Sequence, residues 1–226
     1  MIRHYNASKL ARSSFFRQLI QYVDQEGSVT LRQIKEVFPD QAKLNRQLEA
    51  FIEAGYIERR NRRYQLAFTY LTSLEGIALD SEVFVESDSS LLAALEELHF
   101  LVELVNETNQ AIIQEEVDFL REELTLSSYF YKVREQLPLS PEQEELFHLL
   151  GDVNYQYAMK YLTTFLLKFS RKERVIQKRP DIFVGALLLL GYIKKIDEQA
   201  YQLTMELDRE NLVFRPPSDR EKQTRD

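Results

Sequence analysis

The chain contains no cysteine and no tryptophan among its 226 residues. The absence of cysteine excludes disulfides, thiolate metal sites and cysteine nucleophiles. Glycine and proline number only 6 each, which argues against a loop-rich all-β protein and against disorder. The longest near-apolar run, residues 182–192, is too short for a bilayer span of about 20 residues. Because the N-terminal stretch also has no long apolar core, we expect a soluble cytoplasmic protein.

Histidine is scarce as well, with 3 residues in the whole chain. The sequence has no glycine-rich phosphate loop and no nucleophile elbow, and its serines and carboxylates fall in no recognisable catalytic spacing. We therefore expect neither enzyme activity nor a cofactor.

The formal net charge of −7 conceals a strong asymmetry along the chain. Residues 1–70 carry 12 Lys and Arg against 7 Asp and Glu, and residues 151–226 carry 14 against 11. The intervening residues 71–150 carry only 3 against 18. Because charges are screened over about 10 Å, a partner responds to these local surpluses rather than to the total. The sequence thus predicts an acidic middle between two basic ends.

The first part of the chain, from about residue 6 to residue 68, has the pattern of a small helical unit that ends in a hairpin. Ser13 or Ser14, Thr30 and Asp40 are suitable N-caps, and apolar residues recur at helical spacing after each of them. Glycine or proline ends each run, so we expect helices near residues 14–25, 31–38 and 41–54. Two alternating runs then flank an arginine-rich turn at residues 59–63, which indicates a hairpin.

This order of helix, short strand, helix, helix and hairpin resembles the winged-helix variant of the helix-turn-helix. The resemblance rests on SVTLRQIKEVF at residues 28–38, on PDQAKLNRQLEAFIEAGYI at residues 39–57, and on the arginine-rich hairpin. It implies that the third helix is the element that would enter the DNA major groove, with its N-terminal residues nearest the bases.

The candidate DNA-binding residues form two groups. The third-helix group is Gln41, Lys43, Asn45, Arg46 and Gln47, and the hairpin group is Arg59, Arg60, Arg62 and Arg63. Arginine and glutamine have the donor geometry for guanine and adenine edges, and the hairpin arginines suit phosphate or minor-groove contact. The alternative interpretation is that these are ordinary solvated charges, since many winged helices bind proteins and a fold does not determine a function.

A similar phrase returns near the other end of the chain. Gly191-Tyr192-Ile193 repeats Gly55-Tyr56-Ile57, and Tyr201-Gln202-Leu203 repeats Tyr64-Gln65-Leu66, which indicates an internal duplication. The third helix of this second copy, residues 181–190, has no polar face, so we do not expect it to read DNA. The basic run at residues 171–179 could contact phosphate, but we favour docking on the acidic middle of this chain or of a partner.

The acidic middle, residues 87–150, is predicted to be helical. Leucine and valine at helical spacing favour helices from Ser89 or Ser90 through Val105, over residues 110–124 and over residues 127–137, and a capping box at residues 140–143 begins a fourth. The pairs Glu96/His99 and Glu145/His148 have the Glu-x-x-His spacing of di-iron helical bundles. With 36 carboxylates in the chain, coincidence explains these pairs best, and a metal-binding bundle is a distant third hypothesis.

The whole chain also resembles a small uncharacterised domain family that occurs in one or two copies per protein in Gram-positive cocci. The resemblance rests on the repeated GYI and YQL phrases, on LTLSSYFYKV at residues 124–133 and on TTFLLKF at residues 163–169. That family has no known activity, so the resemblance implies repetition and no function.

We therefore predict a mainly α protein with small β-hairpins, in which two winged-helix-like units bracket an acidic helical middle. The predicted divisions are residues 6–86, 87–150 and 151–214, followed by a disordered tail at 215–226. The leading hypothesis is a non-catalytic DNA-binding or regulatory protein that contacts double-stranded DNA through its first unit. The alternative is a protein-interaction scaffold of the same shape, and the acidic middle is where we expect a protein partner or a second copy to bind.

Overall fold

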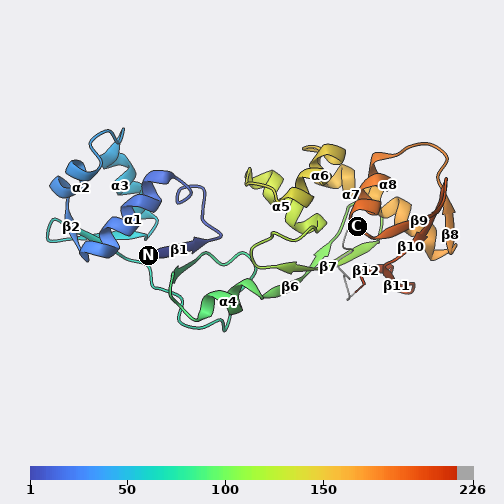
Figure 1. Cartoon of the computed structure of the whole chain (residues 1–226), viewed down its shortest axis with the longest axis horizontal. Coiled ribbons are helices and arrows are strands. Elements are labelled where there is room, and N and C mark those ends of the chain that lie inside the picture. Colours follow the sequence, from blue (N-terminus) through green and yellow to red (C-terminus); the bar gives the residue numbers. More distant parts are fainter. Residues whose placement is uncertain (218–226) are drawn as a thin grey trace. The chain divides into compact units, whose positions relative to one another are not determined.

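A computed structural model describes residues 1–217 of the chain (Figure 1). The chain divides into two compact units, which we call unit 1 (Met1–Glu97) and unit 2 (Leu98–Asp226). Each unit has its own cluster of buried apolar side chains. Arg215 belongs to a strand of unit 2, and the remainder of the predicted disordered tail, from residue 218 onward, lies outside the described residues.

The fold is mixed, and the prediction of a mainly α protein is wrong. Helices make up 37% of the structure and strands 23%, and the strands of the described residues form four sheets. The error arises mostly in the acidic middle, where two long predicted helices are strands instead.

Unit 1 contains four helices and five strands within the described residues. In chain order they are β1 (Ile2–Tyr5), α1 (Ser14–Glu26), β2 (Val29–Thr30), α2 (Leu31–Val37), α3 (Leu44–Glu53), β3 (Ile57–Arg60), β4 (Arg63–Leu66), β5 (Val83–Glu86) and α4 (Leu91–Glu96). Ser13 caps α1 by accepting a hydrogen bond from the Phe16 amide, and Thr30 and Gln33 form a capping box on α2. These helices agree with the predicted ones to within a few residues.

Two small sheets frame the helices of unit 1. Strands β2, β4 and β3 form one sheet in that order, and β1 pairs with β5 in the other. The core between them is rich in aromatic rings, with Phe16 of α1 packed edge-on against Phe51 of α3 and Tyr56. Because these rings lie on the inner sides of α1 and α3, the polar sides of both helices face outward.

Unit 2 begins with a strand and is built around a larger sheet. Its elements are β6 (His99–Leu104), β7 (Ile112–Asp118), α5 (Leu126–Glu135), α6 (Pro141–Leu150), α7 (Tyr155–Leu166), a short 3₁₀ helix (Leu167–Ser170), β8 (Arg174–Ile176), α8 (Ile182–Leu189), β9 (Ile193–Asp197), β10 (Ala200–Leu203), β11 (Glu206–Asp208) and β12 (Val213–Arg215). The predicted capping box of Ser140 and Gln143 is present at the start of α6.

The four-stranded sheet of unit 2 has the order β11-β12-β7-β6, in which β12 runs parallel to β7. Helices α5, α6 and α7 lie on one side of β6 and β7 in Figure 1. Leu104, Ile113 and Phe214 of the sheet belong to the same buried cluster as Tyr129 of α5 and Leu162 of α7. The sheet therefore buries one face under the helices.

The predicted helices at residues 90–105 and 110–124 are wrong for a physical reason. Only Leu91–Glu96 is helical, and β6 and β7 follow. Along β6, the side chains of Phe100, Val102 and Leu104 point inward while those between them are exposed, which is the alternation of a half-buried strand. Leucine and valine in this stretch happen to fit both the helical period and the period of two, and pairing with β7 decides between them.

The two Gly-Tyr-Ile phrases end their helices with the same hydrogen bonds. Gly55 and Gly191 have positive φ angles of 79° and 71°, which only glycine adopts without strain. The Tyr56 amide donates to the Phe51 carbonyl at 3.0 Å, and the Tyr192 amide donates to the Leu187 carbonyl at 2.9 Å. The carbonyls of both tyrosines also accept an amide hydrogen bond at 3.0 Å from the residue that follows the returning strand.

The three-stranded sheets at these junctions share a strand order. Strand β4 lies between β2 and β3, and β10 lies between β8 and β9. Val29 is opposite Tyr64 in the first sheet, and Val175 is opposite Tyr201 in the second. The segments differ between strand and helix, because residues 177–181, all of them described, form no counterpart of α2.

Within residues 1–217, no helix combines the length and the apolar character that crossing a bilayer requires.

Candidate nucleic-acid interface

Helix α3 begins later than the sequence predicts. Pro39 to Lys43 form turns, and Lys43 has a left-handed backbone (φ 55°), so the first helical residue is Leu44. The prediction that Asp40 caps this helix is wrong, because Lys43 occupies the N-cap position without a capping side-chain bond. As a result, Gln41 and Lys43 precede the helix, while Asn45, Arg46 and Gln47 lie in its first turn.

The residues of the third-helix group differ in their exposure. Lys43, Asn45 and Arg46 are exposed, whereas Gln41 and Gln47 are half-buried. The side-chain amide of Gln41 donates to that of Gln47 at 2.7 Å. The two glutamines are thus engaged with each other, and the first turn of α3 presents one amide and two cations to a partner.

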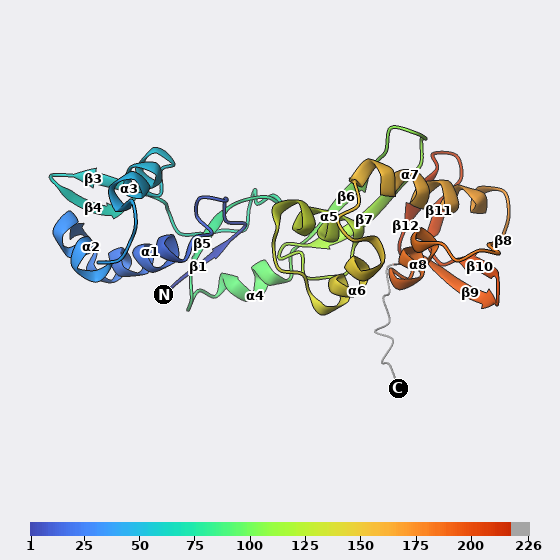
Figure 2. The same ribbon diagram turned by 90° about the horizontal axis from the view of Figure 1, so that it is seen from above.

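The β3–β4 hairpin projects from the helices of unit 1 (Figure 2). Its turn residues, Asn61 and Arg62, both have positive φ angles, 49° and 65°. Two residues of this conformation form the tight turn that suits the twist of a hairpin. Asparagine tolerates this conformation well, but arginine adopts it seldom, so the turn holds Arg62 at the tip in a strained backbone.

The four hairpin arginines are not equivalent, although the sequence treats them alike. Arg60 pairs with Glu58 at 2.7 Å, and Arg63 donates to the hydroxyl of Ser28 at 2.8 Å. The Arg59 guanidinium lies 5.6 Å from the centre of the Tyr64 ring. Within the described residues Arg62 makes no hydrogen bond or ion pair, so it is the arginine most available to a ligand.

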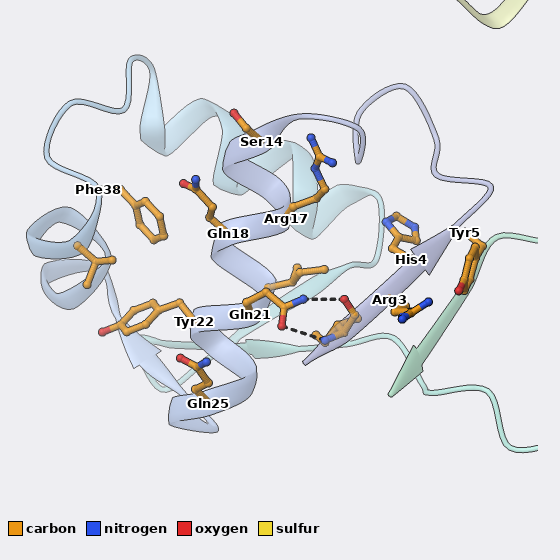
Figure 3. A pocket seen from close by; sticks show the side chains of 13 residues that line it. Arg3, His4, Tyr5, Ser14, Arg17, Gln18, Gln21, Tyr22, Gln25 and Phe38 are labelled. Carbon is orange, nitrogen blue, oxygen red and sulfur yellow. Dashed lines mark hydrogen bonds between the residues drawn. The ribbon is translucent and has the colours of Figure 1, made fainter. Parts of the chain in front are cut away.

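A second surface of unit 1 is an open groove of about 1020 Å³ along α1. Figure 3 shows Arg17, Gln18, Gln21 and Gln25 along one side of the helix, with β1 beside them and Phe38 at the opposite end. The side-chain amide of Gln21 bonds both the amide and the carbonyl of Ile2, at 2.9 and 2.7 Å, as a neighbouring strand would. Two arginines and no carboxylate are among the residues that line the groove.

A buried polar network links β1 to the end of α3, and sequence reasoning missed it. Glu82 accepts hydrogen bonds from the Tyr56 hydroxyl at 2.9 Å and from the Ser8 amide at 3.0 Å, and lies 2.8 Å from the His4 ring. The His4 ring stacks on Phe84 at 4.0 Å. Burial lowers the pKa of His4, and the Glu82 carboxylate opposes this effect. Only the repeated tyrosine signalled this network in the sequence.

Unit 2 has a parallel contact at its own Gly-Tyr-Ile phrase. The Tyr192 hydroxyl donates to the Glu115 carboxylate, which also accepts the amides of Leu126 and Ser127 at 2.9 and 2.8 Å. Glu115 is fully buried and holds the first turn of α5. This role differs from the metal ligation for which Glu115 was considered.

The Glu-x-x-His pairs do not form a metal site. Glu96 is the last residue of α4 and His99 the first of β6, so the one-turn helical spacing is absent. Glu145 and His148 both lie on α6 and are exposed. Among residues 1–217, no three acidic or histidine side chains gather closely enough to hold a metal ion.

Comparison with known proteins reaches only unit 1. Residues 2–98 match the model of a family described as "Domain of unknown function (DUF1803)". No curated protein and no solved structure matches the chain. The match ends within a residue of the boundary of unit 1, and it agrees with the expected resemblance to an uncharacterised family. Unit 1 is thus similar to a domain family of unknown function.

Proposed function

We propose that unit 1 contains a winged-helix domain and binds double-stranded DNA through α3 and the β3–β4 hairpin. The observation that carries the proposal is the exposed, basic first turn of α3 in the same compact unit as the exposed arginine hairpin. The order α1-β2-α2-α3-β3-β4 and the sheet order β2-β4-β3 support the winged-helix assignment. The shared helix ends and strand order of residues 174–203 support a diverged second copy.

In this proposal α3 reads base edges and the hairpin holds the phosphate backbone. Lys43, Asn45 and Arg46 supply donors at the helix N-terminus, which is the end that approaches bases in helix-turn-helix proteins. Arg62 makes the principal phosphate or minor-groove contact, and Arg59 adds a second. Gln41 and Gln47 contribute by fixing the turn before α3, because they bond each other.

Fluorescence anisotropy with a labelled duplex, measured over a range of salt concentrations, tests the proposal. We expect Arg46→Ala to weaken binding by about 1–3 kcal/mol, and each hairpin arginine that contacts phosphate to account for about one unit of the salt slope. The matched control is Lys194→Ala with Lys195→Ala, because these exposed lysines occupy the hairpin of the second copy. The proposal fails if the Arg59/Arg60/Arg62/Arg63→Ala variant binds as the wild type does, or if neither binds.

The groove along α1 favours a second candidate function, the binding of an acidic protein segment. Arg17 lines the groove without a hydrogen bond or ion pair to any described residue, and Arg3 pairs only loosely with Glu96 at 3.6 Å. A polyglutamate peptide titrated calorimetrically separates the two candidates. Arg17→Glu should abolish peptide binding and Arg46→Ala should leave it unchanged, whereas DNA binding should respond in the opposite way.

A further inference from the structure

Strand β6 is at an edge of the four-stranded sheet in unit 2. It pairs with β7 on one side, and no strand of residues 1–217 pairs with its other side. The strand has six residues, and a free edge of that length is a ready site for pairing with another chain.

The register with β7 determines which residues of β6 point their backbone groups to the free edge. The Phe119 amide donates to the Leu98 carbonyl at 2.9 Å, and Phe100, Val102 and Leu104 follow in the same phase. Because the hydrogen-bonded positions of an antiparallel pair alternate, the amides and carbonyls of His99, Leu101 and Glu103 point away from β7. These three residues are therefore the ones that an added strand would bond.

The side chains of the same three residues are exposed on the sheet face opposite the core. Leu101 is 64% exposed, which is unusual for leucine in the middle of a strand. His99 lies 3.1 Å from Glu123, and Glu103 accepts a hydrogen bond from Gln114 at 2.5 Å. These contacts hold an imidazole and a carboxylate on either side of the exposed leucine.

We propose that β6 pairs antiparallel with β6 of a second copy of this chain, about a two-fold axis at Leu101. This register places Leu101 opposite the partner's Leu101, and His99 opposite the partner's Glu103. All outward backbone groups then meet outward groups, and an apolar pair is flanked by two pairs of complementary charge. The two sheets of four strands join into one continuous sheet.

The other registers that keep the backbone bonds are less favourable. An axis at Glu103 would place two carboxylates opposite each other, and an axis at His99 would place Leu101 opposite the partner's Glu97. An axis at Phe100 or Val102 would oppose outward groups to groups already bonded to β7. A one-residue shift also reverses which face each side chain occupies. The pattern of β6 thus selects one symmetric pairing, of the isologous kind that most soluble homodimers use.

Light scattering coupled to size exclusion, over a wide concentration range, tests the proposal with the full chain. We expect a dimer for the wild type and at least about a tenfold weaker dimer for Leu101→Lys, which places two like charges opposite each other. The matched control is Ile176→Lys, at another edge-strand position of similar exposure, 59%, and it should dimerise as the wild type does. A wild type that is monomeric throughout, or a dimer indifferent to Leu101→Lys, overturns the proposal.

Charge reversal tests the register itself. Glu103→Lys should weaken the dimer, and adding His99→Glu to it should restore dimerisation, because the opposed charges are then complementary again. If the double variant is as weak as the single variant, the proposed register is wrong.

The absence of cysteine allows a direct distance test. In a hydrogen-bonded antiparallel pair the α-carbons are about 5.5 Å apart, which a disulfide can bridge. Leu101→Cys should therefore give a covalent dimer on oxidation, while Ile176→Cys should stay monomeric under the same conditions. These measurements do not involve DNA, so their outcome is independent of the function proposed for unit 1.

Discussion

Helices α3 and α8 end in the same Gly-Tyr-Ile junction, but their outer sides meet different surroundings. Aligning Gly55 with Gly191 places Glu49 of α3 at the position of Gly185 in α8. Glu49 is exposed, whereas a β-carbon on Gly185 would lie 3.7 Å from Leu149 of α6. Helix α6 packs on α8, so the second helix has lost the polar side that the first retains. The comparison teaches that the junction serves packing, and that function must be sought in what α3 leaves uncovered.

The tyrosines of the two junctions also bond carboxylates of different burial. The side chain of Glu82 is 28% exposed, whereas Glu115 is fully buried. Water can replace lost contacts at the first site but not at the second.

The largest predicted effect breaks this second contact. Glu115→Ala leaves two backbone amides and the Tyr192 hydroxyl without their acceptor, and we expect it to destabilise unit 2 by about 3–5 kcal/mol. Glu82→Ala should cost unit 1 only about 1–2 kcal/mol, since water reaches that site. Amide hydrogen exchange measures each unit separately, which matters because the units can unfold independently. Equal losses in both units would contradict the comparison.

The next effect concerns the covered side of α8. Gly185→Glu installs the residue that α3 has at this position, and we expect it to destabilise unit 2 by about 1–3 kcal/mol by displacing Leu149. The counterpart Glu49→Ala should change the stability of unit 1 by no more than about 0.5 kcal/mol. Chemical denaturation of both variants provides the measurement. A tolerated Gly185→Glu would mean that α6 does not hold this side of α8.

A smaller effect should appear as a pH dependence that only unit 1 has through His4. The pKa of His4 is lowered in the folded state, mainly by burial among Phe84, Phe16 and Tyr56, with Glu82 in opposition. The unfolded chain therefore takes up a proton more readily as the pH falls below about 6.5, and unit 1 loses stability there. His4→Gln should flatten this loss in thermal or urea unfolding between neutral and mildly acidic pH. An unchanged profile would assign the dependence to another group.

The smallest effect distinguishes the two hairpin turns. Arg62→Gly removes a non-glycine residue from a positive-φ position, and we expect it to stabilise the β3–β4 hairpin by about 0.5–1 kcal/mol. The β9–β10 turn contains no positive-φ residue, so Gln199→Gly should bring no such gain. If Arg62 contacts phosphate as proposed, the same variant should lower the salt slope of DNA binding by about one unit. A loss of stability would show that Arg62 has a structural contact.

Much of unit 1 could be predicted because its signals are local. Ser13 and Thr30 sit directly before the helices they cap, and Gly55 directly after the helix it ends. The start of α3 could not be read in this way, because Asp40 is as good a cap by residue type as any, and the turn at Lys43 displaces the helix beyond it.

The acidic middle and the site network could not be predicted because long-range contacts determine them. Ile112 and Ile113 of β7 pair with β12, about a hundred residues further on, and β1 pairs with β5 across most of unit 1. The bond from Tyr56 to Glu82 likewise joins segments that carry no shared local pattern. Local periodicity cannot reveal such partners, so it assigned helices where a distant strand imposes a sheet.

The position of β12 has a consequence for how unit 2 is made in the cell. This strand comes last in the described chain, yet it lies inside the sheet, between β11 and β7. During synthesis, β6 and β7 therefore emerge early and wait, with one side of β7 unpaired, until residue 215 has left the ribosome. Contacts of such sequence separation are slow to form, and an unpaired strand invites aggregation meanwhile. Unit 2 should thus depend more than unit 1 on chaperones while it folds.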